Sequence, residues 1–243
     1  MPSSSTGQFV VSLAKTVHWN GREIPRRMMN GLEFADTGSM PSLAPDQHVD
    51  RYLDRFWLVI PSQPSARQRL FWAFFQIIAA DYERLIDKDR NIENIDGLLG
   101  AVVNRLKLAP RDVVLDFGCG TGLSALAPRA GTLRIVGYDA SSNMRRIARH
   151  RGLEVWSPRD LMGTPTGAIR AAIASYVLHL VPPAATFGEL WRKLGPGGVV
   201  AANFHKGRGA ETVTAIVARH GGHIESISSH PHHGPTFAFT KIR

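Results

Sequence analysis

The second half of the sequence predicts an α/β fold: a doubly wound, mostly parallel sheet of seven strands whose last strand is antiparallel. Two observations support this fold class. From residue 111 onward, short apolar runs alternate with helical patterns, and strands separated by helices are typical of parallel sheets covered on both faces. Only "HPHHGP" joins the last two runs, so the final strand is expected to be antiparallel. In chain order the runs are "VVLDF", "LRIVGYD", "LEVWS", "AAIASYVL", "GGVVAANF", "HIESISS" and "TFAFTKI".

The residues before this sheet predict a separate, mainly helical region. Residues 1–8 are small and polar, which is typical of a disordered tail. Residues 9–109 are assigned to a helical lid that binds the substrate, within which residues 30–48 are rich in Gly, Ser and Pro and indicate a loop. The core that carries the seven strands is expected to span residues 110–243.

Two helices are expected within the lid. Ser65 and Gln68 form a capping-box pattern that marks the start of the first helix. A second helix runs from Ile95 to Leu106, and Pro110 lies just beyond its end. The apolar positions that recur at helical intervals in the first helix are Phe71, Phe74, Phe75, Ile78, Tyr82, Leu85 and Ile86.

Composition excludes several classes of protein. The longest apolar run, "LFWAFFQIIAA", is interrupted by Gln76 and is far shorter than a membrane-spanning helix. The first residues lack the pattern of a secretory signal, so we expect a cytoplasmic protein without a membrane span. Cys119 is the only cysteine, which excludes an intramolecular disulfide and a multi-cysteine metal site.

The formal net charge of +9 comes mainly from residues 111–243. Part of the excess lies in the run "MRRIARHR", which fits either a solvated helix face or a surface that meets nucleic acid or acidic substrates. We favour the solvated face because Arg145, Arg146 and Arg149 recur at helical spacing.

A glycine-rich turn follows the first predicted strand of the core, in "VVLDFGCGTG". Gly118, Gly120 and Gly122 leave the backbone bare, so a ligand can approach it and meet the amide groups of the helix start. Dinucleotide-binding proteins would place the third glycine at position 123, which is Leu123 here. Asp116 would also repel a pyrophosphate, whereas it suits a ligand that carries an ammonium and a sulfonium charge. The turn therefore predicts a cationic ligand.

Two further acids follow the next two strands. Asp139 ends the second strand, where a carboxylate can accept hydrogen bonds from both hydroxyls of a ribose. Asp160 follows the third strand and is placed to meet the amino group of an adenine, with Leu161 beside the ring. Asp160 equally fits a helix cap.

These motifs resemble those of the class I S-adenosylmethionine-dependent methyltransferases of the small-molecule type. "VVLDFGCGTG" is similar to their first motif, "VGYDAS" to the acidic end of the second strand, "RDL" to the adenine loop, and "ASYVLHLV" and "LGPGGVVAANF" to the fourth and fifth strands. The resemblance covers about residues 80–243 and implies a Rossmann-like core. It implies S-adenosylmethionine as cofactor, with its methionine part at Asp116 and the glycine turn, its ribose at Asp139 and its adenine at Asp160. The other positions that it assigns to the cofactor are Gly118, Cys119, Gly120, Gly122, Ala140, Met144, Leu161 and Ser175.

Candidates for proton transfer follow the fourth and fifth strands. A sulfonium already activates its methyl group, so the protein mainly aligns a nucleophile and excludes water, and only some substrates need a base. The candidate catalytic residues are Tyr176, His179 and His205. His179 could take a proton from a hydroxyl or an acidic carbon, or it could simply pack on the cofactor or the following helix. Many similar proteins carry an Asp near the start of the fourth strand, where "AIRAAIASYV" offers only alanines.

The histidines of "HPHHGP" are expected at the same sheet edge as the cofactor, because the last strand runs antiparallel. The strand order usual for this fold would bring His232 or His233 toward His205. Such a cluster could surround an anionic substrate group or a metal. We favour an ordinary polar loop and assign no metal, because histidines without nearby carboxylates form an incomplete metal site.

The sequence favours a small, partly apolar organic molecule as methyl acceptor and leaves oxygen, nitrogen or carbon open as the acceptor atom. "SYVL" lacks the N/D-P-P-Y/F pattern of enzymes that methylate exocyclic amines of nucleic acids, and Cys119 lies in the cofactor turn rather than where cytosine C5 enzymes need a nucleophile. We expect a monomer or homodimer without a nucleic-acid substrate. An RNA methyltransferase, a non-methylating enzyme on the same fold and a regulatory cofactor-binding protein stay as alternatives. The residues assigned to substrate binding are Trp72, Phe75, Tyr82 and Tyr176.

Overall fold

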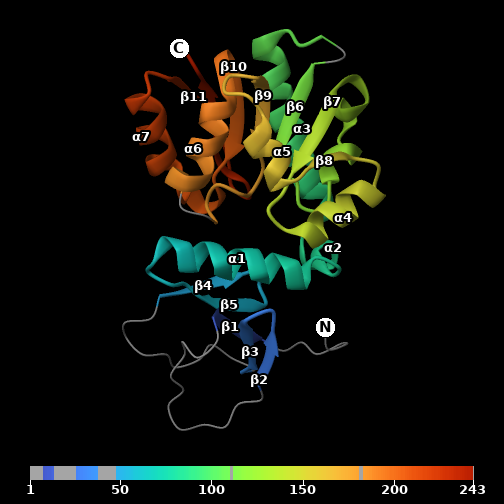
Figure 1. Cartoon of the computed structure of the whole chain (residues 1–243), viewed down its shortest axis with the longest axis vertical. Helices are drawn as coiled ribbons and strands as arrows, with labels where there is room; N and C mark the ends of the chain where they lie inside the picture. The colour runs from blue at the N-terminus through green and yellow to red at the C-terminus, as the bar shows by residue number, and fades with distance from the viewer. Residues whose placement is uncertain (1–7, 14–25, 38–47, 110–111, 181–182, 243) are drawn as a thin grey trace. The chain divides into compact units, whose positions relative to one another are not determined.

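The computed structural model of this chain describes residues 8–13, 26–37, 48–109, 112–180 and 183–242. The chain divides into two compact units, Met1–Ile86 and Asp87–Arg243 (Figure 1). Each unit is described by itself below. Seven of the eight residues of the expected disordered tail lie outside the described residues, so that expectation stays a prediction.

The first unit contains a five-stranded sheet, whereas the sequence predicts a mainly helical lid. The strand order is β2-β3-β1-β5-β4, with β1 antiparallel to β3 and parallel to β5. The strands escape detection because they have only four or five residues, and β2 is exposed along its whole length. One of them, β3, also falls within the segment predicted as loop. The bounds are β1 Phe9–Leu13, β2 Arg26–Met29, β3 Leu32–Asp36, β4 Val49–Tyr52 and β5 Phe56–Val59.

Two helices complete the first unit, α1 (Pro64–Ile78) and α2 (Tyr82–Leu85). The expected first helix is thus confirmed up to Ile78, but a break at residues 79–81 separates its last turn. The capping-box prediction for Ser65 and Gln68 is wrong, because the N-cap is Gln63, without a side-chain cap. A proline with its fixed φ suits the first helical position, so Pro64 sets the start of the helix.

The second unit is built on the seven-stranded sheet that the sequence predicts (Figure 1). The strand order is β11-β12-β10-β9-β6-β7-β8, and the strands from β10 to β8 are parallel. The last strand, β12, pairs antiparallel with both β10 and β11, which confirms its predicted direction. The bounds are β6 Val113–Phe117, β7 Arg134–Tyr138, β8 Glu154–Trp156, β9 Ile169–Ala174, β10 Leu194–Asn203, β11 His223–His230 and β12 Gly234–Thr240.

Helix α3 (Lys88–Leu106) belongs to this second unit, although the sequence places it in the lid. It packs against β9 and β10, and its apolar side chains, among them Leu98, Leu99 and Val102, are buried. The predicted boundary at residues 109 and 110 therefore moves to residues 86 and 87. The helical pattern alone shows that a face is buried, but not which sheet buries it.

The remaining helices connect successive strands. Between β6 and β7 the structure has two short 3-10 helices rather than the expected α-helix, because Pro128 starts a new turn after the first four residues. The described bounds are η1 Leu123–Leu126, η2 Pro128–Thr132, α4 Ser142–His150, α5 Pro158–Gly163, α6 Pro183–Lys193, η3 His205–Gly207 and α7 Ala210–Arg219.

The alanine side chains of β9 and β10 are divided between the two faces of the sheet. Ala172, Ala174 and Ala202 lie in a core cluster with side chains of α6 and α7, such as Phe187 and Val213. Side chains alternate along a strand, so Ala171 and Ala201 lie on the opposite face. Both are completely buried.

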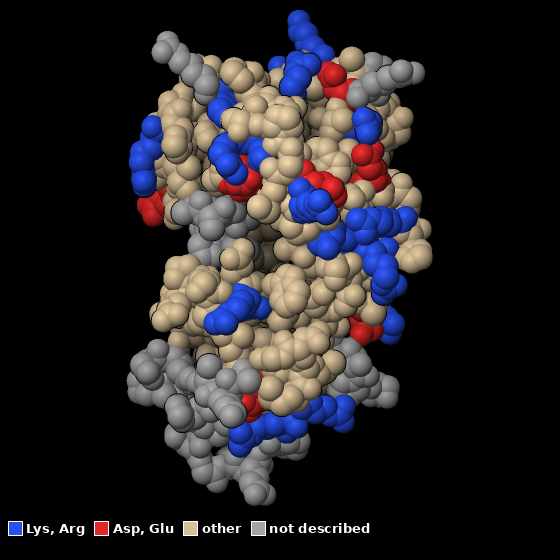
Figure 2. All heavy atoms as spheres, viewed as in Figure 1, with Lys and Arg blue, Asp and Glu red and all other residues tan. Residues whose placement is uncertain are grey.

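Charged side chains lie at the surface of both units. Figure 2 shows Lys and Arg gathered over the part that Figure 1 labels α4, where the sequence is "SNMRRIARH". Within the described residues, no helix is long and apolar enough to cross a bilayer.

The assignment of α3 to the second unit predicts the effect of Leu99→Ala. Leu99 is completely buried, so truncation should lower the free energy of unfolding by about 2–5 kcal/mol. Urea unfolding followed by circular dichroism measures this change. Leu126→Ala is the matched control, because Leu126 of η1 is 45% exposed and should change stability by less than about 0.5 kcal/mol. Equal effects of the two substitutions would contradict the assignment.

Candidate functional site

The glycine turn after β6 adopts a backbone that other residues would strain. Gly118, Gly120 and Gly122 have φ values of 84°, 53° and 81°, in the left-handed region. Space is restricted as well, because a Cβ on Gly118 would lie 2.6 Å from Cγ2 of Val177. The turn therefore needs glycine for its dihedral angles and for its close approach to the segment that follows β9.

The amide groups of this turn have partners within the protein. The N–H groups of Gly118 and Cys119 donate to the carbonyl of Tyr138 at 2.7 and 2.9 Å. The N–H of Gly120 donates to Oδ2 of Asp139 at 2.9 Å. We expected such amides to face a ligand, and the structure instead uses these three to tie the turn to the end of β7. Cys119 is buried, and a Cβ on Gly137 would come within 2.7 Å of its Sγ.

Asp116 lies at the end of β6 and is only 2% exposed. Burial raises the pKa of its carboxyl to about 7, the Ser124 hydroxyl opposes this rise and the charge of Asp139 adds to it. Several buried side-chain atoms in the described part of the chain have no hydrogen-bond partner, and Oδ2 of Asp116, Oγ1 of Thr121 and Oγ of Ser124 are among them. A buried carboxylate with an unused oxygen is suited to a cationic group, which would supply the missing partner.

Asp139 is held at the corner between β7 and α4. Its Oδ1 accepts from the N–H of Ser141 at 2.8 Å, in addition to the bond from Gly120. Burial raises the pKa of Asp139, while these two hydrogen bonds and the charge of Arg145 oppose the rise. Each carboxylate oxygen has a second lone pair, so ribose hydroxyls could still bind.

Arg145 is a positioning residue that the sequence does not reveal. Its Nη1 donates to the carbonyls of Asp139 and Ala140 at 2.6 and 2.9 Å, so it fixes the backbone at this corner. In the sequence, Arg145 fits a solvated basic helix face. In the structure, its side chain lies against the corner between β7 and α4. Met144, also on α4, is 1% exposed, and its N–H donates to the N-cap hydroxyl of Ser141.

Asp160 caps helix α5, the alternative that the sequence left open. Its Oδ2 accepts from the N–H of Ser157 at 2.7 Å, and its own N–H donates to Oγ of Ser157, which completes a capping box. These hydrogen bonds hold the pKa of Asp160 below its ordinary value. Leu161 is 2% exposed and belongs to the core cluster of the second unit.

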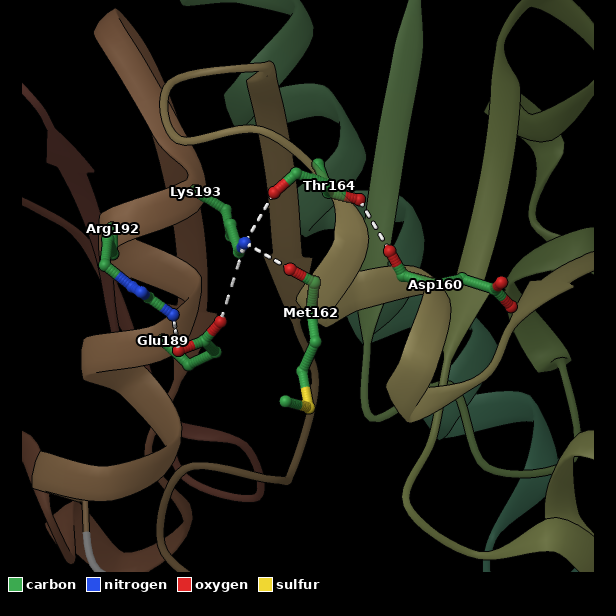
Figure 3. Close-up of polar contacts among 6 residues, drawn as sticks. All are labelled: Asp160, Met162, Thr164, Glu189, Arg192 and Lys193. Carbon is green, nitrogen blue, oxygen red and sulfur yellow. Dashed lines mark hydrogen bonds and ion pairs between the residues drawn. The ribbon is translucent and has the colours of Figure 1, made fainter.

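Lys193 of α6 holds the other end of α5 (Figure 3). Its Nζ donates to the carbonyls of Met162 and Thr164 at 2.8 and 2.5 Å and lies 3.8 Å from Oε1 of Glu189. The lysine is only 4% exposed, and the Asp160 carboxylate points away from it. Lys193 therefore fixes α5 through its backbone.

Two asparagines organise the segment after β9. The Nδ2 of Asn94 donates to Oγ of Ser175 at 2.9 Å and to Oδ1 of Asn203 at 3.1 Å. The same Asn203 oxygen accepts the N–H of Tyr176 at 2.9 Å, and its Nδ2 donates to the carbonyl of His233. Tyr176 has a φ of 51°, which is uncommon for a residue with a side chain. The buried amides thus hold Tyr176 in a strained conformation.

The predicted catalytic residues come together at this edge. The rings of His179 and His205 are 5.8 Å apart, and Tyr176 lies 6.0 Å from His205. The hydroxyl of Tyr176 is hydrogen-bonded to Nδ1 of His233, which confirms that the β11–β12 turn reaches the same edge. His232 lies next to His230 instead. Within the described ranges, no three His, Cys, Asp or Glu side chains are close enough to hold a metal ion.

The other predicted substrate-binding residues belong to the first unit. Phe75 and Tyr82 are half-buried with ring centroids 6.1 Å apart, and Phe75 also contacts Tyr52 and Phe74. Trp72 is 47% exposed on α1. The structure therefore brings Phe75 and Tyr82 together and leaves Trp72 at the surface, while Tyr176 belongs to the second unit.

The comparisons with known proteins identify the family. The sequence model described as "Methyltransferase domain" matches residues 90–230, more than half of the chain. The chain belongs to this family. A trans-aconitate 2-methyltransferase of Azoarcus sp. is 38% identical over 102 residues, which cover 40% of each protein. An uncharacterized methyltransferase of Schizosaccharomyces pombe is 36% identical over 76 residues, 31% of this chain and 29% of the relative. The chain thus matches less than half the length of either relative.

Solved structures show the same fold. A SAM-dependent methyltransferase from Thermotoga maritima superposes with a TM-score of 0.52 at 18% identity, covering 70% of this chain and 99% of the other. A second methyltransferase structure, from Methanococcus maripaludis, superposes with a TM-score of 0.50 at 15% identity and covers 69% of this chain and 94% of the other. These matches confirm the predicted Rossmann-like core, and the sequence model shows the methyltransferase family. The cofactor named for the Thermotoga maritima protein is S-adenosylmethionine.

The residues of the second unit fit this cofactor. The unused oxygen of Asp116 complements an ammonium group, and the left-handed glycines keep side chains away from the turn. Asp139 offers acceptors for hydroxyl groups at the end of the neighbouring strand. Which atoms of the cofactor each residue meets stays a prediction.

Asp116→Asn tests the buried charge. A carboxyl whose pKa is raised in the folded protein contributes stability that is present below its ordinary pKa of 3.8 and lost as the pH rises through about 7. Each pKa unit corresponds to roughly 1.4 kcal/mol. We expect the difference in melting temperature, variant minus wild type, to be more positive at pH 8 than at pH 5. We also expect the affinity of the variant for S-adenosylhomocysteine to fall at least about tenfold.

Scanning calorimetry at both pH values and isothermal titration measure these two effects. Asp54→Asn is the control, because its side chain is 98% exposed and should change neither quantity. A melting difference between variant and wild type that is independent of pH would contradict the assignment of a buried, ionising Asp116.

Lys193→Met tests the attachment of α5. The substitution keeps an unbranched apolar stem but removes the donors to the carbonyls of Met162 and Thr164, so it should lower the free energy of unfolding by about 1–3 kcal/mol. Urea unfolding measures the change. Lys206→Met at an exposed position is the matched control and should be within about 0.5 kcal/mol of wild type. Wild-type stability of Lys193→Met would show that α5 does not depend on this lysine.

Proposed function

We propose that this protein transfers a methyl group from S-adenosylmethionine to a small, partly apolar organic molecule, acting in the cytoplasm as a monomer or homodimer. The observation that carries the proposal is the buried Asp116 carboxylate, which has an oxygen without a hydrogen-bond partner. Asp116 precedes the glycine turn in the chain and is close enough to Asp139 for the charge of Asp139 to raise its pKa. When bound, S-adenosylmethionine supplies a methyl group on a sulfonium, and the electron pair of the broken carbon–sulfur bond stays on sulfur.

Each site residue then has a role in binding this cofactor. Asp116 pairs with the ammonium group, and Asp139 accepts the ribose hydroxyls while Arg145 holds the corner in place. Asp160 presents its carboxylate, fixed by the capping box, to the adenine amino group. The turn residues Gly118, Cys119, Gly120 and Gly122, together with Ala140, Met144, Leu161 and Ser175, line the same site.

The methyl acceptor is assigned to the edge where β9 and β10 end. Tyr176, His179 and His205 lie together there and offer hydrogen-bonding groups next to the cofactor turn. The substrate-binding role that the sequence predicts for Trp72, Phe75 and Tyr82 of the first unit stays a prediction. The Azoarcus relative, named for trans-aconitate, supports a small molecule as acceptor.

An RNA substrate is less well supported by the structure. The basic helix α4 would be its docking surface, yet Arg145 and Arg149 of this helix donate to backbone carbonyls of the protein itself. Guanidinium groups used in this way hold the fold in place, so less positive charge is available for phosphates. Transfer that falls steeply with added salt would instead favour RNA.

Asp139→Asn tests the proposed function through binding. The amide keeps the volume of the carboxylate but loses half of its acceptor capacity, so we expect the affinity for S-adenosylhomocysteine to fall at least about tenfold. Isothermal titration measures the affinity, with NADH as a second ligand that should not bind. Glu154→Gln is the matched control, because this exposed acid on β8 pairs only with Arg134 among the contacts described.

Transfer itself is measured with methyl-labelled S-adenosylmethionine and a library of small organic molecules. Labelled product would support the proposal. Binding of S-adenosylhomocysteine without labelled product from any substrate class would indicate a regulatory cofactor-binding protein. NADH binding, or no binding of either ligand, would refute the assignment of the turn.

A further inference from the structure

A tyrosine–histidine pair lies at the acceptor edge of the second unit. The hydroxyl of Tyr176, after β9, is hydrogen-bonded to Nδ1 of His233 in the β11–β12 turn. His233 is 6% exposed, and Tyr176 is half-buried. The two residues are far apart in the sequence, so the pair exists only because β12 lies between β10 and β11.

Both members of the pair are held by the same buried side chain. Asn203 is completely buried, accepts the N–H of Tyr176 and donates to the carbonyl of His233. Tyr176 keeps a left-handed φ of 51°, a conformation that persists only where the surroundings enforce it. Strained residues held in this way cluster at functional sites, so the Tyr176 hydroxyl is a candidate functional group.

The pair lies beside the cofactor turn. Val177 follows Tyr176 directly, and a Cβ on Gly118 would come within 2.6 Å of its side chain. The segment that carries Tyr176 is therefore in contact with the turn assigned to the methionine part of the cofactor. A methyl acceptor bound beside Tyr176 would therefore lie close to the turn.

The protonation states give the hydrogen bond a direction. Burial raises the pKa of Tyr176 to about 12, so the phenol keeps its proton at neutral pH. Burial and the nearby His230 lower the pKa of His233, so its ring is neutral and Nδ1 can accept. The neutral ring then carries its proton on Nε2. The charged and titratable groups that act on the pair are Asp87, the N-cap of α3, Arg90 and Glu93 of α3, His230 of β11 and His232 of the β11–β12 turn.

We infer that Tyr176 and His233 form a relay that takes up the proton of a hydroxyl-bearing methyl acceptor. This inference rests on the proposed function and deepens it by naming the acceptor class. As the acceptor oxygen uses a lone pair for its bond to the methyl carbon, the electron pair of its O–H bond stays on oxygen. The released proton binds Oη of Tyr176, and the proton of Tyr176 moves to Nδ1 of His233. The positive charge lost from the sulfonium thus ends on the imidazolium of His233, which exchanges with solvent.

The relay selects among acceptors by the proton that they must lose. A hydroxyl group becomes a good nucleophile only if a base removes its proton as the new bond forms, and such a base contributes about 10²–10⁴-fold to the rate. A carboxylate is already ionised at neutral pH and needs no base. A built relay therefore fits phenols, enols or alcohols and predicts methyl ethers as products.

The first test measures the pair without turnover. Nitrogen-15 NMR of the histidine rings, with S-adenosylhomocysteine bound, should show Nδ1 of His233 unprotonated and Nε2 protonated. Tyr176→Phe removes the donor that favours the neutral ring, so the pKa of His233 should rise in that variant. A proton on Nδ1 in wild type, or an unchanged pKa in Tyr176→Phe, would overturn the inference.

The second test measures transfer and product. His233→Asn keeps an acceptor for the phenol but cannot be protonated, so it separates hydrogen bonding from proton uptake. We expect Tyr176→Phe and His233→Asn each to lower the rate about 10²–10⁴-fold, with little further loss in the double variant because the pair acts as a unit. Affinity for S-adenosylhomocysteine should stay within about twofold of wild type, and His220→Asn, at an exposed position, should have no effect.

The products distinguish this inference from the proposed function. Using methyl-labelled S-adenosylmethionine and a mixed library of phenols, enols, alcohols and carboxylic acids, we expect alkali-stable methyl ethers. Alkali-labile methyl esters alone would overturn the relay and leave the proposed function standing. Binding of S-adenosylhomocysteine without any product from this library would overturn the relay. The proposed function would fall as well if the wider library of small organic molecules also gave no labelled product.

Discussion

The carbonyl of Tyr138 and the carboxylate of Asp139 together accept three amide groups from the glycine turn, and the site depends on this connection. Parallel strands have no hairpin to fix their ends relative to one another. Here the end of β7 serves that purpose by holding the turn that follows β6. The same contacts set the position of Asp116, the last residue but one of β6, relative to Asp139. The two acids that we propose to bind the cationic group and the ribose hydroxyls of the cofactor are thus placed by one backbone arrangement.

The glycine turn with Asp116 and the edge with Tyr176 each contain a group that, considered by itself, disfavours folding. Asp116 places an ionisable carboxyl with an unused oxygen in the interior, where burial disfavours its charge. Tyr176 keeps a left-handed backbone that asparagine side chains enforce. A ligand with a complementary charge would relieve the first of these costs. Such local conflicts are expected where a fold is adapted for binding and chemistry rather than for stability.

The sequence predicts the second unit well because its signals are local. Apolar runs, the glycine turn and the acids at strand ends each occupy a few consecutive residues, and the short "HPHHGP" connection determines the direction of β12. The polar contacts that organise the site are not local. Asn94 and Asn203 are 109 positions apart, and Lys193 meets carbonyls about thirty residues earlier, so no spacing rule could reveal them. The sheet of the first unit was missed because its strands are short and irregularly buried.

The alanines of the central strands have an evolutionary consequence. Ala171 and Ala201 are completely buried on the face opposite the α6 and α7 cluster, and helix α3 packs on β9 and β10. Larger side chains there would push the helix outward and carry Asn94 away from Asn203. Covariation between these alanines and the two asparagines should therefore mark the relatives that share this acceptor edge, even where their histidines have diverged.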